Sequence, residues 1–187
     1  YRRQRQMCIR DRKADMFAKS VEVLTAHQWH RLSNNHWRQT NRERNIYNEL
    51  GKSACDCLAF GCGAGGRLKG YGFMMNRSLA DWSAGVDAGL KPVMVMTAPG
   101  PNWALLRTVS SDMESGAINL PCISERFGVD VDALTREVTS QWEEAGLVTR
   151  TGDWLVQTVA GQFWHVTLAQ LLVDLIGKAL RKEALAA

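Results

Sequence analysis

Apolar positions recur every three or four residues over long stretches of the chain, and this spacing is typical of amphipathic helices. The first stretch begins at Lys13 and runs to about His30. Ser78 and Asn102 are of residue types preferred at helix N-caps, and each precedes a periodic stretch. Gly89, Gly116 and Gly146 follow such stretches, where glycine commonly ends a helix. The helical ranges predicted by these signals are 13–30, 78–89, 102–116, 123–128, 130–146 and 158–176.

Shorter apolar runs predict extended segments between the helices. CDCLAFG (55–61) reads as a buried strand that feeds a glycine cluster, and KPVMVMT (91–97) as a second strand. LKGYGFM (68–74) forms an extended piece, whereas the polar residues 33–45 form a loop. LVTRTGDWLVQT (147–158) predicts two strands around the turn 151–153.

The two prolines of APGPN (98–102) mark a domain boundary. After it the order is helix, helix, hairpin, helix, which is a winged-helix arrangement, and the alanine-rich tail from Lys178 is a fraying helix end. The predicted fold class is therefore α/β followed by α+β.

Charge is distributed unevenly along the chain. Residues 1–12 hold five arginines and one aspartate, which accounts for the whole net charge of +4. Residues 13–106 have a net charge of +4 and residues 107–176 one of −6, and this polarity indicates two units. No stretch is apolar enough to span a membrane. Five irregularly spaced cysteines favour a reducing, cytoplasmic setting over a disulfide framework.

A winged helix raises the possibility of DNA binding, because such modules often place the helix before the wing in the major groove. Here that helix, 130–146, has five acidic residues and one arginine. DNA phosphates attract Lys and Arg and repel such a helix. A structural or lid role for the domain is the stronger interpretation, and no DNA partner is expected.

The glycine-rich stretch FGCGAGG (60–66) could let a ligand approach the backbone closely, so phosphate or nucleoside groups are natural occupants. It matches neither the GxGxxG fingerprint nor a phosphate loop ending in GK[ST], because Arg67 and Leu68 follow it. A tight turn without a ligand is the open alternative.

Two further clusters of residues have side chains that could carry chemistry. Cys55, Cys57 and Cys62 lack a nearby fourth ligand, so core thiols are favoured over a metal site, and no metal ligand is assigned. The block NNHWRQTNRERNIYN (34–48) gives either a solvated loop or a cationic rim for an anionic small molecule.

Three blocks in order resemble one family. They are RQTNRERNIYNEL, then DCLAFGCGAGGRLKGYGFMMNR, then ESGAINL, RFGVDVDAL and EEAGLVTRTGDWLVQTVAGQFW. Together they resemble the oxygen-independent coproporphyrinogen III oxidase-like radical SAM enzymes, and within them most closely the anaerobic heme-utilisation methyltransferases of the anaerobilin synthase type. The resemblance runs from about Val21 to Ile176.

The resemblance implies a parent with a partial (β/α) barrel that holds a [4Fe-4S] cluster and S-adenosylmethionine, followed by a winged-helix-like domain on the substrate side. It implies a cytoplasmic enzyme that methylates and opens the porphyrin of heme without oxygen, supplied with electrons by a flavodoxin-type protein. A sister group of heme chaperones binds and transfers heme instead. The family's CxxxCxxC spacing is absent from this chain, so we expect a fragment that is inactive by itself.

Within that resemblance the family's glycine loop maps onto Gly61, Gly63, Ala64 and Gly65, which would bind S-adenosylmethionine. Gly65 stands where the related coproporphyrinogen enzymes have a bulkier residue beside a second S-adenosylmethionine. The arginines of the polar block have charge suited to the propionates of a tetrapyrrole, an inference from charge alone. These arginines are Arg38, Arg42 and Arg44.

These inferences divide the chain into three parts. Residues 13–100 would be the end of the radical SAM barrel, and residues 101–187 the winged-helix-like domain. Residues 1–12, YRRQRQMCIRDR, resemble translated sequencing-adapter DNA, so we expect a non-native segment there, with a disordered native arm as the alternative.

Overall fold

The computed structural model describes residues 2–186, without the side chains of residues 2–8, Lys52 and Ala186. Their contacts divide the chain into two compact units. We call residues 1–45 with 109–187 the terminal unit, and residues 46–108 the central unit. The division after Thr108 falls inside helix α4 (Trp103–Ser115), and the domain boundary at 98–102 stays a prediction.

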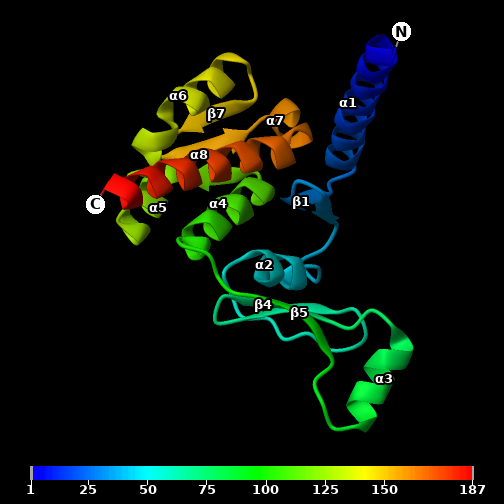
Figure 1. The fold of residues 1–187 in the computed structure, drawn as a ribbon. Coiled ribbons are helices and arrows are strands. Elements are labelled where there is room, and N and C mark those ends of the chain that lie inside the picture. Colours follow the sequence, from blue (N-terminus) through cyan, green and yellow to red (C-terminus); the bar gives the residue numbers. More distant parts are fainter. Residues whose placement is uncertain (1, 187) are drawn as a thin grey trace. The chain divides into compact units, whose positions relative to one another are not determined.

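The terminal unit contains most of the helices (Figure 1). Its elements besides part of α4 are α1 (Arg2–Ala26), β1 (His30–Ser33), β2 (His36–Arg38), β6 (Ala117–Asn119), α5 (Leu120–Phe127), α6 (Val131–Glu144), β7 (Val148–Thr151), β8 (Trp154–Gln157), α7 (Val159–Phe163) and α8 (His165–Ala186). No helix among the described residues is long and apolar enough to cross a membrane.

A three-stranded antiparallel sheet of order β6-β8-β7 forms the centre of the terminal unit. The predicted hairpin is confirmed, since Thr151 pairs with Trp154 across its turn. The short strand β6 was not predicted, and it pairs through Ile118 with Leu155 of β8. Helices α5, α6 and α8 lie around this sheet in Figure 1. The buried apolar side chains between them are Val109, Met113, Ile118, Leu120, Ile123, Val131, Trp142, Val148, Leu155, Leu168, Leu172 and Ile176.

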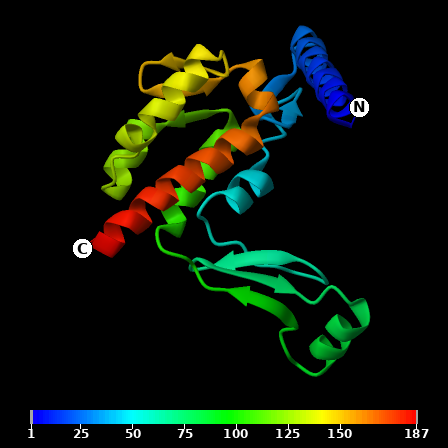
Figure 2. The same ribbon diagram turned by 45° about the horizontal axis from the view of Figure 1, so that its top comes forward.

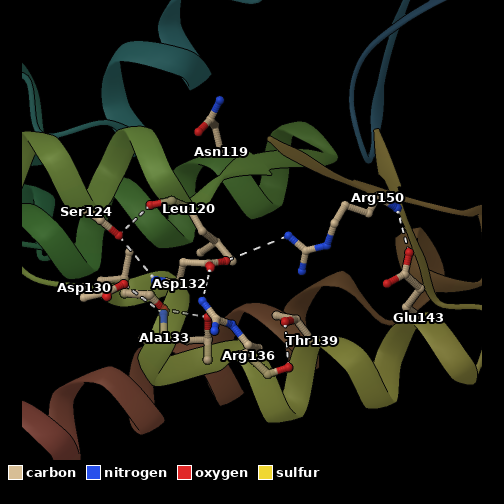
Figure 3. Close-up of polar contacts among 12 residues, drawn as sticks. Asn119, Leu120, Ser124, Asp130, Asp132, Ala133, Arg136, Thr139, Glu143 and Arg150 are labelled. Atoms are coloured by element: carbon tan, nitrogen blue, oxygen red, sulfur yellow. Dashed lines mark hydrogen bonds and ion pairs between the residues drawn. The ribbon is translucent and has the colours of Figure 1, made fainter. Parts of the chain in front are cut away.

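The helices of this unit begin and end largely where their caps indicated. Asp130 accepts a hydrogen bond from the Ala133 amide (2.9 Å) at the start of α6, and Gly146 follows its end with a φ of +68°. Figure 3 shows Asp132 in the first turn of α6 between Arg136, at 2.9 Å, and Arg150, at 3.8 Å. The Arg136 pair lies within the helix, and the Arg150 pair ties the helix to strand β7.

Two predictions for the terminal unit were wrong. Residues 33–45 are not all loop, because β1 and β2 pair as a hairpin with His30 opposite Arg38. The helix expected over 158–176 is two helices separated at Trp164, and the second continues to Ala186, past the expected end. The pairing of β1 with β2 depends on contacts that the local polar pattern does not reveal.

The predicted non-native segment 1–12 begins outside the described residues at Tyr1, and the side chains of residues 2–8 also lie outside them. From Arg2 the backbone is continuous with α1. The Arg10 guanidinium lies over the Trp164 ring at 5.6 Å, and Phe17 packs on Phe163 with ring centroids 5.9 Å apart. The origin of residues 1–12 stays a prediction.

The central unit is built on a second three-stranded sheet of order β3-β4-β5 (Figure 2). Its elements are α2 (Ile46–Lys52), β3 (Gly65–Leu68), β4 (Tyr71–Met75), α3 (Leu79–Asp87) and β5 (Val93–Thr97). The predicted helix after Ser78 and the strand within 91–97 are confirmed, and Ser78 caps α3 by accepting a hydrogen bond from the Asp81 amide. All strand pairs among the described residues are antiparallel, and they form no closed barrel.

The buried strand expected over 55–61 was wrong. Cys57 makes one isolated bridge with Arg67, and residues 58–61 have no strand. Leu58 and Phe60 are 57% and 84% exposed. Since the strands of this sheet start at Gly65, the glycine-rich stretch precedes a strand instead of following one.

Candidate functional site

The glycine-rich loop of the central unit is held by backbone hydrogen bonds to the end of β4. The Gly63 amide donates to the Asn76 carbonyl (2.8 Å), and the Met75 amide donates to the Ala64 carbonyl (2.9 Å). Gly61 and Gly63 have φ values of +100° and +70°, which side-chain-bearing residues rarely adopt. The loop therefore has a fixed path that requires glycine at these two positions.

Gly61 and Gly65 border two different cavities in the central unit. Gly61 borders a largely apolar cavity of about 640 Å³, whose walls include Phe73, Trp82 and Met96. Gly65 borders a groove of about 570 Å³ that includes Arg67 and Arg77. Both volumes suit a small organic ligand.

The two cavities lie on opposite faces of the β3-β4-β5 sheet. Side chains alternate between the faces along a strand. Tyr71 and Met75 of β4 line the apolar cavity, whereas Gly72 and Met74 line the groove. The predicted ligand loop thus stands at the edge of both faces.

The predicted arginine block lies in the terminal unit, and its three members differ in setting. Arg38 is half-buried in β2, whereas Arg42 and Arg44 are exposed between β2 and the start of α2. His36 Nε2 lies 3.7 Å from Glu43 Oε1. Because the glycine loop belongs to the central unit, the structure does not bring the two predicted groups together in one unit.

Arg31 packs among the aromatic side chains of the terminal unit. Its guanidinium lies 4.5 Å from the centre of the Trp37 ring and 5.7 Å from that of Phe17. Burial lowers the pKa of Arg31, as expected when a cation loses part of its water. These contacts assign Arg31 a packing role.

The cysteines provide no metal site within the described residues, where no group of three His, Cys, Asp or Glu side chains could hold a metal ion. Cys55 and Cys122 are exposed, and Cys57 and Cys62 are half-buried. Cys62 Sγ donates to the Asn76 carbonyl (3.2 Å), so this thiol supports the glycine loop. Burial of alternate cysteines in a strand, as expected from the sequence, is not observed.

Arg67, Arg77 and Tyr47 border the groove but were not among the predicted site residues. In the sequence, Arg67 is marked only as a departure from the phosphate-loop motif. The alternation of small and large residues in GGRL and YGFMM was the sequence signal for this groove. That signal can be interpreted only when the pairing register of the two strands is known. In that register Arg67 stands opposite Gly72.

No protein-family model matches the chain. Anaerobilin synthase of Escherichia coli O157:H7 is 34% identical over 165 residues, which is 88% of this chain and 36% of that protein. The coproporphyrinogen III oxidase of Escherichia coli, described as a radical SAM enzyme, superposes with a TM-score of 0.66 at 14% identity. The superposition covers 84% of this chain and 40% of the oxidase.

The second likeness shows that the mixed α/β fold is shared with part of the oxidase. The first confirms the family resemblance drawn from the three sequence blocks. The chain spans little more than a third of the length of that relative, and it is a homologue of the matching part of anaerobilin synthase.

Proposed function

We propose that this chain is part of a radical SAM enzyme that acts on heme, methylating and opening the porphyrin without oxygen and so releasing the iron. The observation that carries the proposal is the 34% identity to anaerobilin synthase over 88% of the chain. The fold shared with a coproporphyrinogen III oxidase supports a tetrapyrrole-handling enzyme.

In this proposal residues 13–100 are the end of the barrel domain and residues 101–187 are a winged-helix-like domain. The order α4-β6-α5-α6-β7-β8 supports the second assignment, because β7 and β8 form a wing after a helix pair. The acidic α6 favours a covering role over nucleic-acid binding, which is why a DNA-binding module is the weakest of the candidate functions.

The glycine loop suits the proposed S-adenosylmethionine site, with Gly61, Gly63, Ala64 and Gly65 as its residues. A Cβ at Gly61 would meet no atom within 4 Å, and one at Gly65 would meet only the Phe73 carbonyl oxygen, at 3.9 Å. A ligand can therefore approach this backbone closely. When bound, S-adenosylmethionine supplies a transferable methyl group, and the loop's part is to hold and orient it.

The [4Fe-4S] cluster of the proposed parent does not fit the described part of this chain. Neither the CxxxCxxC spacing nor a suitable group of side chains is found there. We derive no step through the cluster, and we expect the 187-residue chain by itself to be inactive.

Arg38, Arg42 and Arg44 are proposed to attract the heme propionates. Both exposed members, Arg42 and Arg44, are accessible to an anionic ligand. Replacing all three with glutamine in the full-length protein should weaken heme binding, measured by absorbance titration. Unchanged affinity would reject these residues as the propionate site.

The proposal is tested with the full-length protein, reconstituted with iron and sulfide and assayed without oxygen. With heme, S-adenosylmethionine and a reduced flavodoxin, we expect loss of the porphyrin absorbance and a methylated open tetrapyrrole by mass spectrometry. Transfer of intact heme to an acceptor protein, without turnover, would instead assign the heme-chaperone function. A cytoplasmic location and the flavodoxin-type donor are further predictions of the same proposal.

A further inference from the structure

We propose that the groove on the Gly65–Gly72 face of the central sheet is a carboxylate-binding site, in which Arg67 and Arg77 hold the anionic group of a ligand with a flat apolar body. The choice of probes below rests on the proposed function. The groove itself carries the site, and no sequence motif or comparison assigns it.

The register of the sheet creates the groove. Arg67 of β3 pairs with Gly72 of β4, and Gly72 pairs in turn with Thr97 of β5. Next along the strands, Gly65 pairs with Met74. Each glycine removes a side chain beside a large one on the same face, so the sheet surface is bare next to the Arg67 guanidinium.

Arg67 is fixed before any ligand arrives. Its amide donates to the Cys57 carbonyl (2.7 Å), and its Nη1 donates to the Ser53 carbonyl (3.0 Å). Its guanidinium lies 5.9 Å from the centre of the Trp103 ring. These contacts immobilise the charge at the groove, which lowers the entropy lost when an anion binds.

Arg77 also lines the groove, two residues after the end of β4. Its Nε donates to Met74 Sδ (3.2 Å), and a Cβ at Gly63 would lie 3.8 Å from its Cγ. The exposed Arg77 side chain therefore runs along the glycine loop. Its two Nη groups are oriented by the Nε contact and suit a bidentate carboxylate.

The composition of the walls defines the class of ligand. Arg67 and Arg77 are the only charged side chains among the described residues that line the groove, and no carboxylate opposes them. The remaining walls include Tyr47, Met74 and Met94. An aromatic ring with flexible thioethers accommodates a flat apolar body. Porphyrin propionates and the amino-acid carboxylate of S-adenosylmethionine share this carboxylate chemistry.

The test uses the purified 187-residue chain and two probes. Mesoporphyrin IX is compared with its dimethyl ester by quenching of tryptophan fluorescence, and S-adenosylmethionine is titrated by calorimetry. At least one of the two acids should bind, and Arg77→Gln should weaken that binding about tenfold, the usual effect of losing a charge-assisted hydrogen bond. If the porphyrin is the ligand, its ester should bind weakly and should be insensitive to Arg77→Gln.

Gly72→Val tests the groove without touching either arginine. A Cβ at Gly72 meets nothing within 4 Å, and valine suits a strand, so the fold should persist while the groove is filled. We expect loss of binding of the acid probe. Leu68→Ala, on the opposite face of the same sheet, is the control and should leave affinity unchanged.

Arg67→Lys completes the set. It is preferred to Arg67→Gln, which would remove the charge that donates to the Ser53 carbonyl and could destabilise the fold. The lysine keeps the charge but loses the planar fork, so affinity should fall while circular dichroism stays unchanged. The site is overturned if neither acid binds, or if the acid that binds does so equally well to wild type, Arg77→Gln and Gly72→Val. Porphyrin turnover by the full-length protein is a separate readout, so the proposed function can fail while the carboxylate site stands.

Discussion

Asn34 and Gln157 form a buried polar contact between segments more than a hundred positions apart. Asn34 Nδ2 donates to the Met113 carbonyl (3.0 Å) and to Gln157 Oε1 (3.1 Å), while Gln157 Nε2 donates to the same carbonyl (2.8 Å). Both residues are almost wholly buried. This contact joins the β1-β2 hairpin to the end of α4 and to β8.

Replacing Asn34 with alanine should destabilise the chain by about 1–3 kcal/mol, because Gln157 Oε1 is left buried without its donor. The measurement is the urea midpoint followed by circular dichroism. Asn35→Ala is the matched control, since Asn35 is exposed in the same turn. Equal midpoints for the two variants would show that the buried contact has no net effect.

Asp112 gives the chain a pH-dependent stability. Burial raises the pKa of this carboxyl to about 6, against the opposing charge of Arg126. The folded state therefore favours the protonated acid. Its stabilising effect is complete below pH 3.8, the ordinary value, and is lost as the pH rises through about 6.

Asp112→Asn should remove this pH dependence. At pH 7 the variant should be more stable than wild type by about 1 kcal/mol, a figure lowered because solvent reaches the part-buried carboxyl. Near pH 3.5 the two should differ little. The measurement is urea unfolding of both proteins at both pH values. If wild type and variant differed in stability by the same amount at pH 7 and pH 3.5, the raised pKa of Asp112 would be contradicted.

At the scale of single elements, Gly66 and Gly72 of the central sheet have opposite surroundings. A Cβ at Gly66 would lie 2.6 Å from Phe73 Cζ and 2.7 Å from the Cys57 carbonyl oxygen. The same atom at Gly72 would contact nothing within 4 Å. Gly66 is thus required by close packing between β3 and residues 57–59.

Gly66→Ala should therefore destabilise the central unit by about 1–3 kcal/mol through overpacking. Gly72→Ala, in the neighbouring strand, should be neutral or slightly stabilising because alanine restricts the unfolded chain. Urea denaturation of the two variants side by side checks this. A tolerated Gly66→Ala would mean that Phe73 and the 57–59 backbone can move apart.

Most helices were predicted because their signals are local, although α2 was missed, the first helix ends at Ala26, and the helix expected over 158–176 is two helices. Ser78 and Asp130 accept hydrogen bonds from amides within their own first turns, and Gly146 follows the end of α6 with positive φ. Strands depend on distant partners. Cys57 makes only one bridge, so an apolar run there formed no strand, and the three residues of β6 are too few to show a period.

The candidate site was predictable in part for the same reason. The glycines of the loop stand out in the sequence, and the positive φ values of Gly61 and Gly63 agree with the predicted need for glycine there. Arg67 gains meaning only when the register places Gly72 opposite it, and Arg77 only when the fold brings its side chain beside Gly63. Arg38, Arg42 and Arg44 stand out in the sequence by their charge density alone. Charge density carries no information about which surfaces of the protein lie together.

At the scale of the whole molecule, the excess positive charge lies in residues 1–12, not in α6, the helix before the β7-β8 hairpin. Residues 1–12 account for the net charge of +4, and α6 with its cap has five acids and one arginine. A chain that lacks residues 1–12 is neutral overall. DNA affinity comes mainly from Lys and Arg side chains that neutralise phosphates, and the acidic α6 does not supply them.

The chain without residues 1–12 should therefore show no salt-sensitive binding to duplex DNA in a gel shift at low micromolar protein. The full chain is the comparison, because its arginines can bind DNA weakly and without sequence preference. Sequence-specific binding by the shortened chain would contradict the covering role proposed for residues 101–187.

Strand β5 has a practical consequence for work with this chain. It pairs only with β4 among the described strands, all five of its residues are exposed, and its sequence VMVMT holds no charge. An uncharged edge with unpaired amides and carbonyls can add a strand from another molecule. Concentrated preparations of the chain should therefore aggregate through β5, and Met96→Lys, at a side chain 65% exposed, would place a charge on that edge and keep the protein monomeric.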